Sequence, residues 1–168
     1  MSNPNQYKSH HIEESDEAFS NWFFSNTMRE IIFTMTGMEV IEEKATAETI
    51  KDFKEQISGV TMLIGNKRIM ISLSMSMYTA KSLIAAMTGL RAENLTQADL
   101  ADGAAELVNI IAGKVKANLS STGDHYDILL PYTITGDNHS IIHKNKVAAL
   151  IRLYHTDNIA LIAKVFFM

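Results

Sequence analysis

The chain contains two pairs of apolar segments rich in strand-forming residues, and each pair predicts an antiparallel hairpin. Residues 57–64 (ISGVTMLI) and 68–75 (RIMISLSM) are separated only by the turn-forming residues 65–67 (GNK). Residues 147–154 and 159–167 are likewise joined by a short polar turn. Strands connected so tightly run antiparallel, because a parallel partner would need a long crossover connection.

Capping residues predict three helices, and two of them stop at a glycine suited to the left-handed C-terminal position. The residues that mark the ends are Ser15 with Gly37, Ser76 with Gly89, and Thr96 with Asp99, which start the third and longest helix. Residues 40–53 are densely charged and weakly periodic, so we expect a short strand followed by a loop. Residues 126–135 have the composition of a further strand. Helices mixed with hairpins in this way predict an α+β fold, in which helices pack on one mainly antiparallel sheet.

The overall composition is that of a globular protein without a basic surface. The 168 residues are 46% hydrophobic and 20% charged, with a formal net charge of −4, so nucleic acid and anionic membranes are not expected partners. No cysteine is present, which excludes disulfides, thiolate zinc sites and a cysteine nucleophile. We expect residues 1–14 to be a flexible polar tail without signal-peptide character, and residues 15–168 to be a single domain. No apolar run approaches the ~20 residues that span a bilayer, so we expect a cytoplasmic protein.

The longest predicted helix carries its polar residues on one side. At about 100° per residue, its larger apolar residues fall on one stripe. These core-facing residues are Leu100, Ala104, Leu107, Val108, Ile111, Val115 and Leu119. The opposite side is a narrow ridge made of Asp99, Asp102, Glu106, Asn109, Gly113 and Ala117. Glu106 and Asn109 are neighbours on this ridge, because residues at i and i+3 project side by side.

The ridge is unusual in its small residues. Glycine inside a helix costs about 1 kcal/mol relative to alanine, and asparagine is also a poor helix former. Small residues around one acid and one amide suit close approach by another surface. An ordinary solvent-facing side of the helix is the alternative interpretation.

The ridge residues resemble the signature of the CheX/CheC chemotaxis phosphatases. That signature is an aspartate or serine, three residues, a glutamate, two residues and an asparagine, followed by a proline. The matching residues are Asp102, Glu106, Asn109 and Pro131, with Ile111-Ala112-Gly113 continuing the likeness. The 21 residues between Asn109 and Pro131 are slightly fewer than is usual in the family.

Two further segments extend the resemblance over most of residues 18–168. Residues 34–39 (TMTGME) are similar to the end of the family's first helix, and residues 131–136 (PYTITG) to the segment that begins with its proline. CheC-like members carry a second acid–amide motif in the first helix, whereas this chain has none there. The chain therefore resembles a CheX-like member with a single site.

The resemblance implies a two-layer CheC-like fold and hydrolysis of the aspartyl phosphate of a phosphorylated CheY-like receiver domain. Asn109 would hold the attacking water, and Glu106 would pair with the receiver's active-site lysine. Asp102, Gly113 and Pro131 would have supporting roles. The resemblance also implies a homodimer, no cofactor or metal of its own, and Mg²⁺ on the receiver. The alternative on the same fold is a catalytically silent module that binds a receiver or dimerises a signalling complex.

Two other groupings are interpreted as structural. His139 and His143 are four residues apart but follow a turn, and the H-E-x-x-H pattern of a helical zinc site is absent. Serines at 120–121 ahead of Asp124 and His125 resemble a hydrolase triad, yet no nucleophile elbow surrounds them. We expect a helix end and a loop there. No motif supports an enzyme acting on a small molecule.

Overall fold

The computed structural model describes residues 23–121, 123–141 and 147–168. Its strands are β1 (Ile41–Lys44), β2 (Ile57–Ile64), β3 (Arg68–Met75), β4 (Asp127–Ile128), β5 (Tyr132–Thr135), β6 (Ala148–His155) and β7 (Ala160–Phe167). They form one sheet in the order β1-β6-β7-β3-β2-β4, with β5 also paired to β2. Every pairing is antiparallel. Both predicted hairpins, β2–β3 and β6–β7, are confirmed.

The described helical elements include helices that end at the predicted glycines Gly37 and Gly89 and helices that begin after the predicted caps Ser76 and Thr96. They are η1, a π-helical turn (Phe23–Met28), α2 (Arg29–Thr36), α3 (Ala47–Asp52), α4 (Met77–Thr88), η2, a 3₁₀ turn (Ala92–Asn94), and α5 (Gln97–Ser121). Gly37 and Gly89 have φ of 72° and 71°, the left-handed region that favours glycine. Ser76 caps α4 by accepting a hydrogen bond from the backbone N–H of Thr79 at 3.1 Å. The expected N-cap Ser15 and the tail 1–14 lie outside the described residues.

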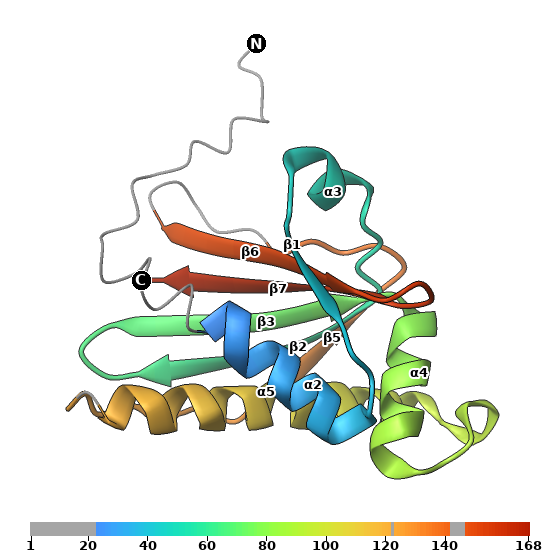
Figure 1. Cartoon of the computed structure of the whole chain (residues 1–168), viewed down its shortest axis with the longest axis horizontal. Coiled ribbons are helices and arrows are strands. Elements are labelled where there is room, and N and C mark those ends of the chain that lie inside the picture. The colour runs from blue at the N-terminus through green and yellow to red at the C-terminus, as the bar shows by residue number, and fades with distance from the viewer. Residues whose placement is uncertain (1–22, 122, 142–146) are drawn as a thin grey trace.

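The helices α2, α4 and α5 pack on one face of the sheet (Figure 1). Helix α5 runs along β2, with α2 and α4 beside it. Their apolar sides and the facing strand residues make one continuous core. Its fully buried members include Met28, Ile32, Ile57, Leu63, Ile71, Leu73, Leu83, Val108, Ile111 and Tyr154. The predicted α+β fold, with helices on an antiparallel sheet, is confirmed.

Two glycines allow α5 to lie close to its neighbours. A Cβ on Gly59 of β2 would overlap the backbone oxygen of Ala104 and lie 3.2 Å from Cγ1 of Val108. A Cβ on Gly103 would lie 2.7 Å from Cγ1 of Ile84, on α4. Because a side chain at either position would push α5 away, these glycines fix how deeply the helix sits against β2 and α4.

The loop expected between β1 and β2 contains a short helix instead. Helix α3 begins after Thr46, whose hydroxyl accepts a hydrogen bond from the backbone N–H of Thr49 at 3.1 Å. None of the residues of α3 is buried. The helix therefore has no apolar stripe to reveal it in the sequence, and the threonine cap was the only available signal.

The single strand expected at residues 126–135 is wrong, because it is broken into β4 and β5. Both strands pair with β2, but Leu63 faces Ile128 whereas Val60 faces Tyr132, so three steps along β2 correspond to four along its partner. One extra residue opposite a regular strand is a β-bulge. We call Leu129–Pro131 the bulge segment; its proline has no N–H to give to the ladder.

Candidate functional site

The start of α5 is fixed by a reciprocal capping interaction. The hydroxyl and the backbone N–H of Thr96 donate to Oδ2 of Asp99 at 2.7 and 2.8 Å, and the N–H of Asp99 donates to the Thr96 hydroxyl at 3.2 Å. These bonds, chiefly the one from the hydroxyl, hold the pKa of the Asp99 carboxyl below its usual range, because they favour the charged form. The predicted capping box is confirmed. It fixes where α5 begins.

The polar ridge of α5 lies on the side of the helix away from β2. Asp102 and Glu106 are exposed, and Asn109 and Gly113 are half-buried. Glu106 and Asn109 are one turn apart, so their side chains are neighbours. Six of the seven residues predicted to face the core are buried, and Leu119 is half-buried. The helical periodicity thus placed both sides of α5 correctly, although Asn109 is less exposed than expected.

The β4–β5 edge of the sheet borders the Asn109 side of the ridge. Thr133 of β5 donates its hydroxyl to the backbone oxygen of Ala101 at 2.7 Å. Nζ of Lys116 lies 3.9 Å from Oδ1 of Asp127 on β4. Asn109 precedes Lys116 by about two turns and therefore lies on the same side of α5. The bulge segment connects β4 to β5 and so passes alongside this part of the helix.

The other side of the ridge is bordered by α2 and α4. Nζ of Lys114 lies 3.4 Å from Oε1 of Glu30 on α2. Lys114 and Lys116 are thus both engaged in ion pairs across the two borders. The exposed charges on the ridge between them are the carboxylates of Asp102 and Glu106, so this surface is negative and suits a cationic group of a partner.

Gly113 is not required by packing within the described part of the chain. A Cβ at this position would meet no atom within 4 Å, in contrast to Gly59 and Gly103. A glycine that weakens a helix without an internal reason favours contact with something outside the chain. The structure brings Asp102, Glu106, Asn109 and Gly113 onto one face, and it places Pro131, half-buried, in the neighbouring bulge segment.

Among the residues weighed as metal ligands or a hydrolase triad, His139 and Ser121 have hydrogen-bond partners within the fold. Within the described ranges, no three His, Asp or Glu side chains are grouped so that they could hold a metal ion. Nε2 of His139 lies 2.7 Å from Oγ of Ser58, and His143 lies outside the described residues. The hydroxyl of Ser121 donates to the backbone oxygen of Asn118 at 2.6 Å, as expected at a helix end. No helix in the same ranges combines the length and the apolar character needed to cross a membrane.

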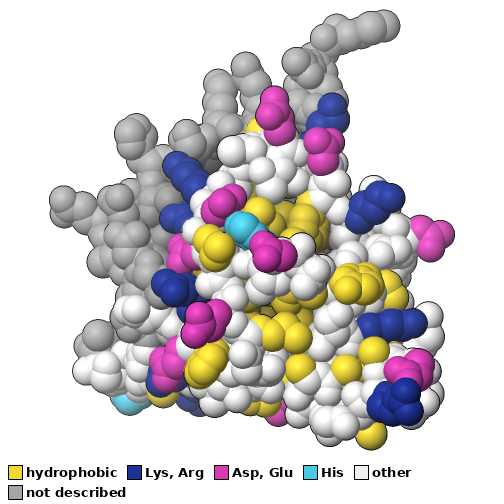
Figure 2. All heavy atoms as spheres, turned by 45° about the vertical axis from the view of Figure 1, so that its right-hand side comes forward, with side chains coloured by type: hydrophobic (Ala, Val, Ile, Leu, Met, Phe, Trp, Pro, Cys, Tyr) yellow, Lys and Arg dark blue, Asp and Glu magenta, His cyan; other side chains and the backbone are white. Residues whose placement is uncertain are grey.

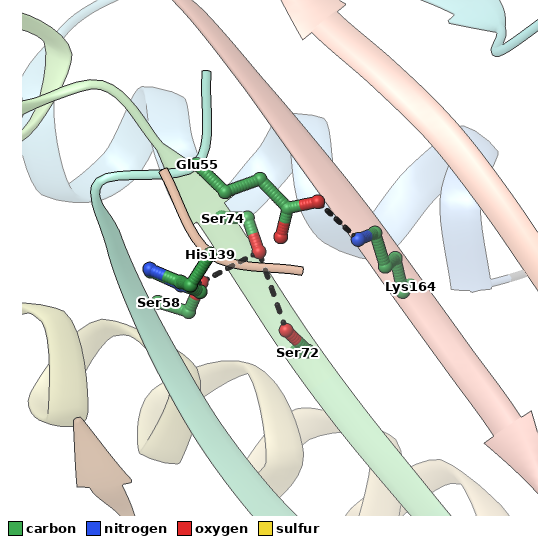
Figure 3. Close-up of polar contacts among 6 residues, drawn as sticks. All are labelled: Glu55, Ser58, Ser72, Ser74, His139 and Lys164. Atoms are coloured by element: carbon green, nitrogen blue, oxygen red, sulfur yellow. Dashed lines mark hydrogen bonds and ion pairs between the residues drawn. The ribbon is translucent and has the colours of Figure 1, made fainter. Parts of the chain in front are cut away.

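A second polar cluster lies on the sheet face opposite the helices (Figure 3). Lys164 of β7 and Glu55 form an ion pair in which the side chains are only 3% and 2% exposed. Oγ of Ser58 lies 2.7 Å both from Oγ of Ser74 and from Nε2 of His139. Ser58 is fully buried, so its hydroxyl cannot reach a substrate even though it is paired with His139. This cluster was missed from the sequence, where its one signal was a single lysine within an otherwise apolar strand.

An open hollow lies where α4 begins, beside the turn between β6 and β7, on the side of the molecule shown in Figure 2. Its volume is about 320 Å³, and Phe53, Tyr78 and Ile159 contribute apolar walls. Lys54 and Asp157 add opposite charges. None of the ridge residues lines this hollow, so it is separate from the acid–amide pair.

Comparison with solved structures identifies the fold. The chemotaxis protein CheX from Vibrio vulnificus is 22% identical, with a TM-score of 0.76 over 89% of this chain and 96% of that one. A CheC-like superfamily protein from Shewanella sp. PV-4 is 23% identical, with a TM-score of 0.77 over 89% and 97%. CheX in a CheX–CheY–BeF₃–Mg²⁺ complex from Borrelia burgdorferi is 22% identical, with a TM-score of 0.74 over 86% and 95%.

The sequence itself identifies the family. No curated protein sequence matches the chain. The family described as chemotaxis phosphatase CheX, however, matches residues 57–154, more than half of the chain and the part that contains α5 and its ridge. This match and the shared fold lead to one conclusion. The chain belongs to the CheX family of chemotaxis phosphatases.

Proposed function

We propose that this protein hydrolyses the aspartyl phosphate of a phosphorylated CheY-like receiver domain. The observation that carries the proposal is the acid–amide pair: Glu106 and Asn109 lie one turn apart on the surface side of α5, in a chain of the CheX family. The solved CheX–CheY–BeF₃–Mg²⁺ complex of Borrelia burgdorferi supports a receiver as the partner. Such a role would place the protein in the cytoplasm.

Asn109 is proposed to hold the attacking water. An acyl phosphate is already reactive, so the rate gain comes mainly from placing a water in line with the phosphorus. The amide oxygen of Asn109 can accept a hydrogen bond from that water while the amide nitrogen donates to a phosphoryl oxygen. Because Asn109 is half-buried, its side chain has fewer orientations to lose when the receiver binds.

Glu106 is proposed to fix the receiver in register by pairing with its active-site lysine. The Glu106 carboxylate is exposed, and the nearby lysines of this chain are engaged elsewhere. A charge-assisted contact that becomes partly desolvated contributes roughly 1.5–3 kcal/mol. Mg²⁺ is expected on the receiver, where it would neutralise part of the phosphoryl charge, and the proposed site needs no metal ligand from this chain.

The remaining residues of the signature are given supporting roles. Gly113 leaves room for the receiver to approach the helix, and Asp102 adds negative charge one turn before Glu106. Pro131 shapes the bulge segment beside Asn109. The resemblance to CheX-like homodimers supports two copies in solution. Light scattering would then give twice the 18.7 kDa of one chain.

The test is the lifetime of phosphate on candidate receivers, with and without the protein, paired with affinity for a BeF₃-activated receiver. Asn109→Ala should remove most of the acceleration and leave affinity nearly unchanged, because its benefit is realised in the transition state. Glu106→Ala should weaken binding and activity together. Asn118→Ala is the matched control, since Asn118 is also half-buried on α5 but outside the ridge. Full activity of Asn109→Ala on a confirmed substrate receiver would show that the mechanism is wrong.

The second candidate is a catalytically silent module that docks on a receiver through the same ridge. It would bind the BeF₃-activated receiver with the same dependence on Glu106. It would never shorten the lifetime of the receiver's phosphate. The same paired measurement therefore separates the two functions, because only the phosphatase couples binding to hydrolysis.

A further inference from the structure

One leucine beside the ridge is exposed to a degree that packing within the chain does not explain. The side chain of Leu130 is 90% exposed, the largest value among the exposed large apolar residues of the described chain. A single exposed leucine is common on protein surfaces. Leu130 differs from an ordinary surface leucine in how its backbone is held and in what lies next to it.

The β-bulge accounts for the exposure of Leu130. In the regular part of the edge, Tyr132 pairs with Val60, and Ile128 pairs with Leu63 in the helix-facing core. Leu130 lies between these two pairings, where the partner strand has one residue too few. It therefore has no opposite residue on β2 to pack against, and its side chain is left standing out from the edge of the sheet.

The backbone on both sides of Leu130 is tied to the fold. The N–H of Leu129 donates to the backbone oxygen of Met62 at 2.8 Å, and the carbonyl of Leu129 accepts from the hydroxyl of Thr61 at 2.8 Å. On the other side, Tyr132 pairs with Val60 of β2, and the hydroxyl of Thr133 donates to the backbone oxygen of Ala101 on α5 at 2.7 Å. Leu130 is thus an apolar side chain on a fixed backbone, and such a group loses little entropy when a partner covers it.

The position of Leu130 along α5 coincides with that of the acid–amide pair. The edge contacts the helix at Ala101, through Thr133, and at Lys116, through Asp127. These contacts are roughly 22 Å apart at 1.5 Å per residue, and Asn109 lies midway between them. The bulge segment connects the two contacting strands, so it passes the same middle part of α5 on the Asn109 side.

A receiver that docks on the ridge needs more contact area than the ridge offers. A specific interface buries about 800 Å² on each partner, whereas the ridge is narrow and rich in small residues. The missing area must come from a border of the ridge. Each border carries an exposed ion pair, Glu30–Lys114 on the α2 side and Lys116–Asp127 at the edge of the sheet, but the bulge segment adds a leucine that is 90% exposed next to Asn109. Removing a leucine side chain from water stabilises an interface more than an exposed ion pair does.

We infer that Leu130 is a docking residue for the receiver, and that it packs against an apolar patch beside the receiver's phosphorylation site while Asn109 reaches the phosphate. This inference rests on the proposed function, because it assigns an anchor to the same complex. Leu130 supplies affinity and register, and Asn109 supplies the chemistry. The two residues should therefore affect different kinetic parameters.

The test replaces Leu130 with serine and compares it with Ile41→Ser. Ile41 is 60% exposed on β1, at the opposite edge of the same sheet, and is a matched control for losing an exposed apolar side chain. Leu130→Ser should weaken affinity for the BeF₃-activated receiver at least about tenfold, and raise KM with kcat nearly unchanged. Ile41→Ser should match wild type. Thermal unfolding of both variants verifies that the fold is retained.

The other outcomes each decide the matter. If the wild-type protein hydrolyses the phosphate and Leu130→Ser binds the BeF₃-activated receiver as tightly as wild type does, the inference is overturned and the proposed function stands. A Leu130→Ser variant that turns a dimer into a monomer without weakening receiver binding assigns Leu130 to contact with a second copy and also overturns it. Tight, Leu130-dependent binding without any hydrolysis supports the docking role while refuting the phosphatase. A wild-type protein that binds no receiver refutes both proposals.

Discussion

Replacing Gly113 with alanine separates what this residue does for the helix from what it does for a partner. Gly113 lies on the ridge of α5, one turn beyond Asn109, and a Cβ there would meet no atom of the described chain within 4 Å. The new methyl group therefore neither clashes nor packs. Only the intrinsic preference of the helix should change the free energy of unfolding.

The size of that change follows from helix propensity. Alanine is more favourable than glycine in a helix interior by about 0.8–1.0 kcal/mol, so Gly113→Ala should stabilise the protein by that amount. For a domain of this size, such a gain raises Tm by about 2–4 °C. Gly103→Ala is the matched control on the same helix. Its Cβ would lie 2.7 Å from Cγ1 of Ile84, so overpacking should offset the propensity gain or exceed it.

Receiver binding should change in the opposite direction from stability. If the receiver covers the ridge, an added methyl beside Asn109 intrudes into the contact. An overpacking cost of about 1–3 kcal/mol would weaken affinity roughly 5- to 150-fold. The assays are urea unfolding of the free protein and titration with a BeF₃-activated receiver. A destabilised Gly113→Ala variant would refute the claim that a Cβ at this position meets no other atom. A stabilised variant with unchanged affinity would refute close approach to the ridge.

Two further predictions concern stability. The pKa of Asp99 is held below its usual range in the folded protein, so the stabilisation from the Thr96 capping box is present above the unfolded value and is lost as pH falls through the folded one. Urea midpoints measured from neutral into acid pH should show this loss, and Thr96→Ala should diminish it. In the buried ion pair, Lys164→Met should cost roughly 3–5 kcal/mol because it strands the Glu55 carboxylate. Adding Glu55→Leu should recover most of the lost free energy of unfolding. Unfolding curves that show equal stability of the single and double variants would contradict this prediction.

The elements that depend on local chemistry were predictable from the sequence. The β2–β3 hairpin, the Ser76 cap and the glycine stops rest on residues adjacent in the chain, and each is present where expected. The ridge of α5 was equally predictable, because a capping box and a 3.6-residue period fix the direction of every side chain on an isolated helix. The adjacency of Glu106 and Asn109 follows from that period alone.

Features that depend on a distant partner were not predictable in this way. The break within residues 126–135 arises from the register against β2, which decides that one residue is left without an opposite neighbour. The Glu55–Lys164 pair joins residues far apart in the chain, and only the sheet brings the two charges together. The bulge segment passes the Asn109 side of α5 because the strands at its two ends contact the helix, β5 through Thr133 and β4 through Asp127. Sequence therefore determined which residues form the ridge, whereas packing of the edge of the sheet against α5 determined what borders it, since strand register is set by long-range pairing.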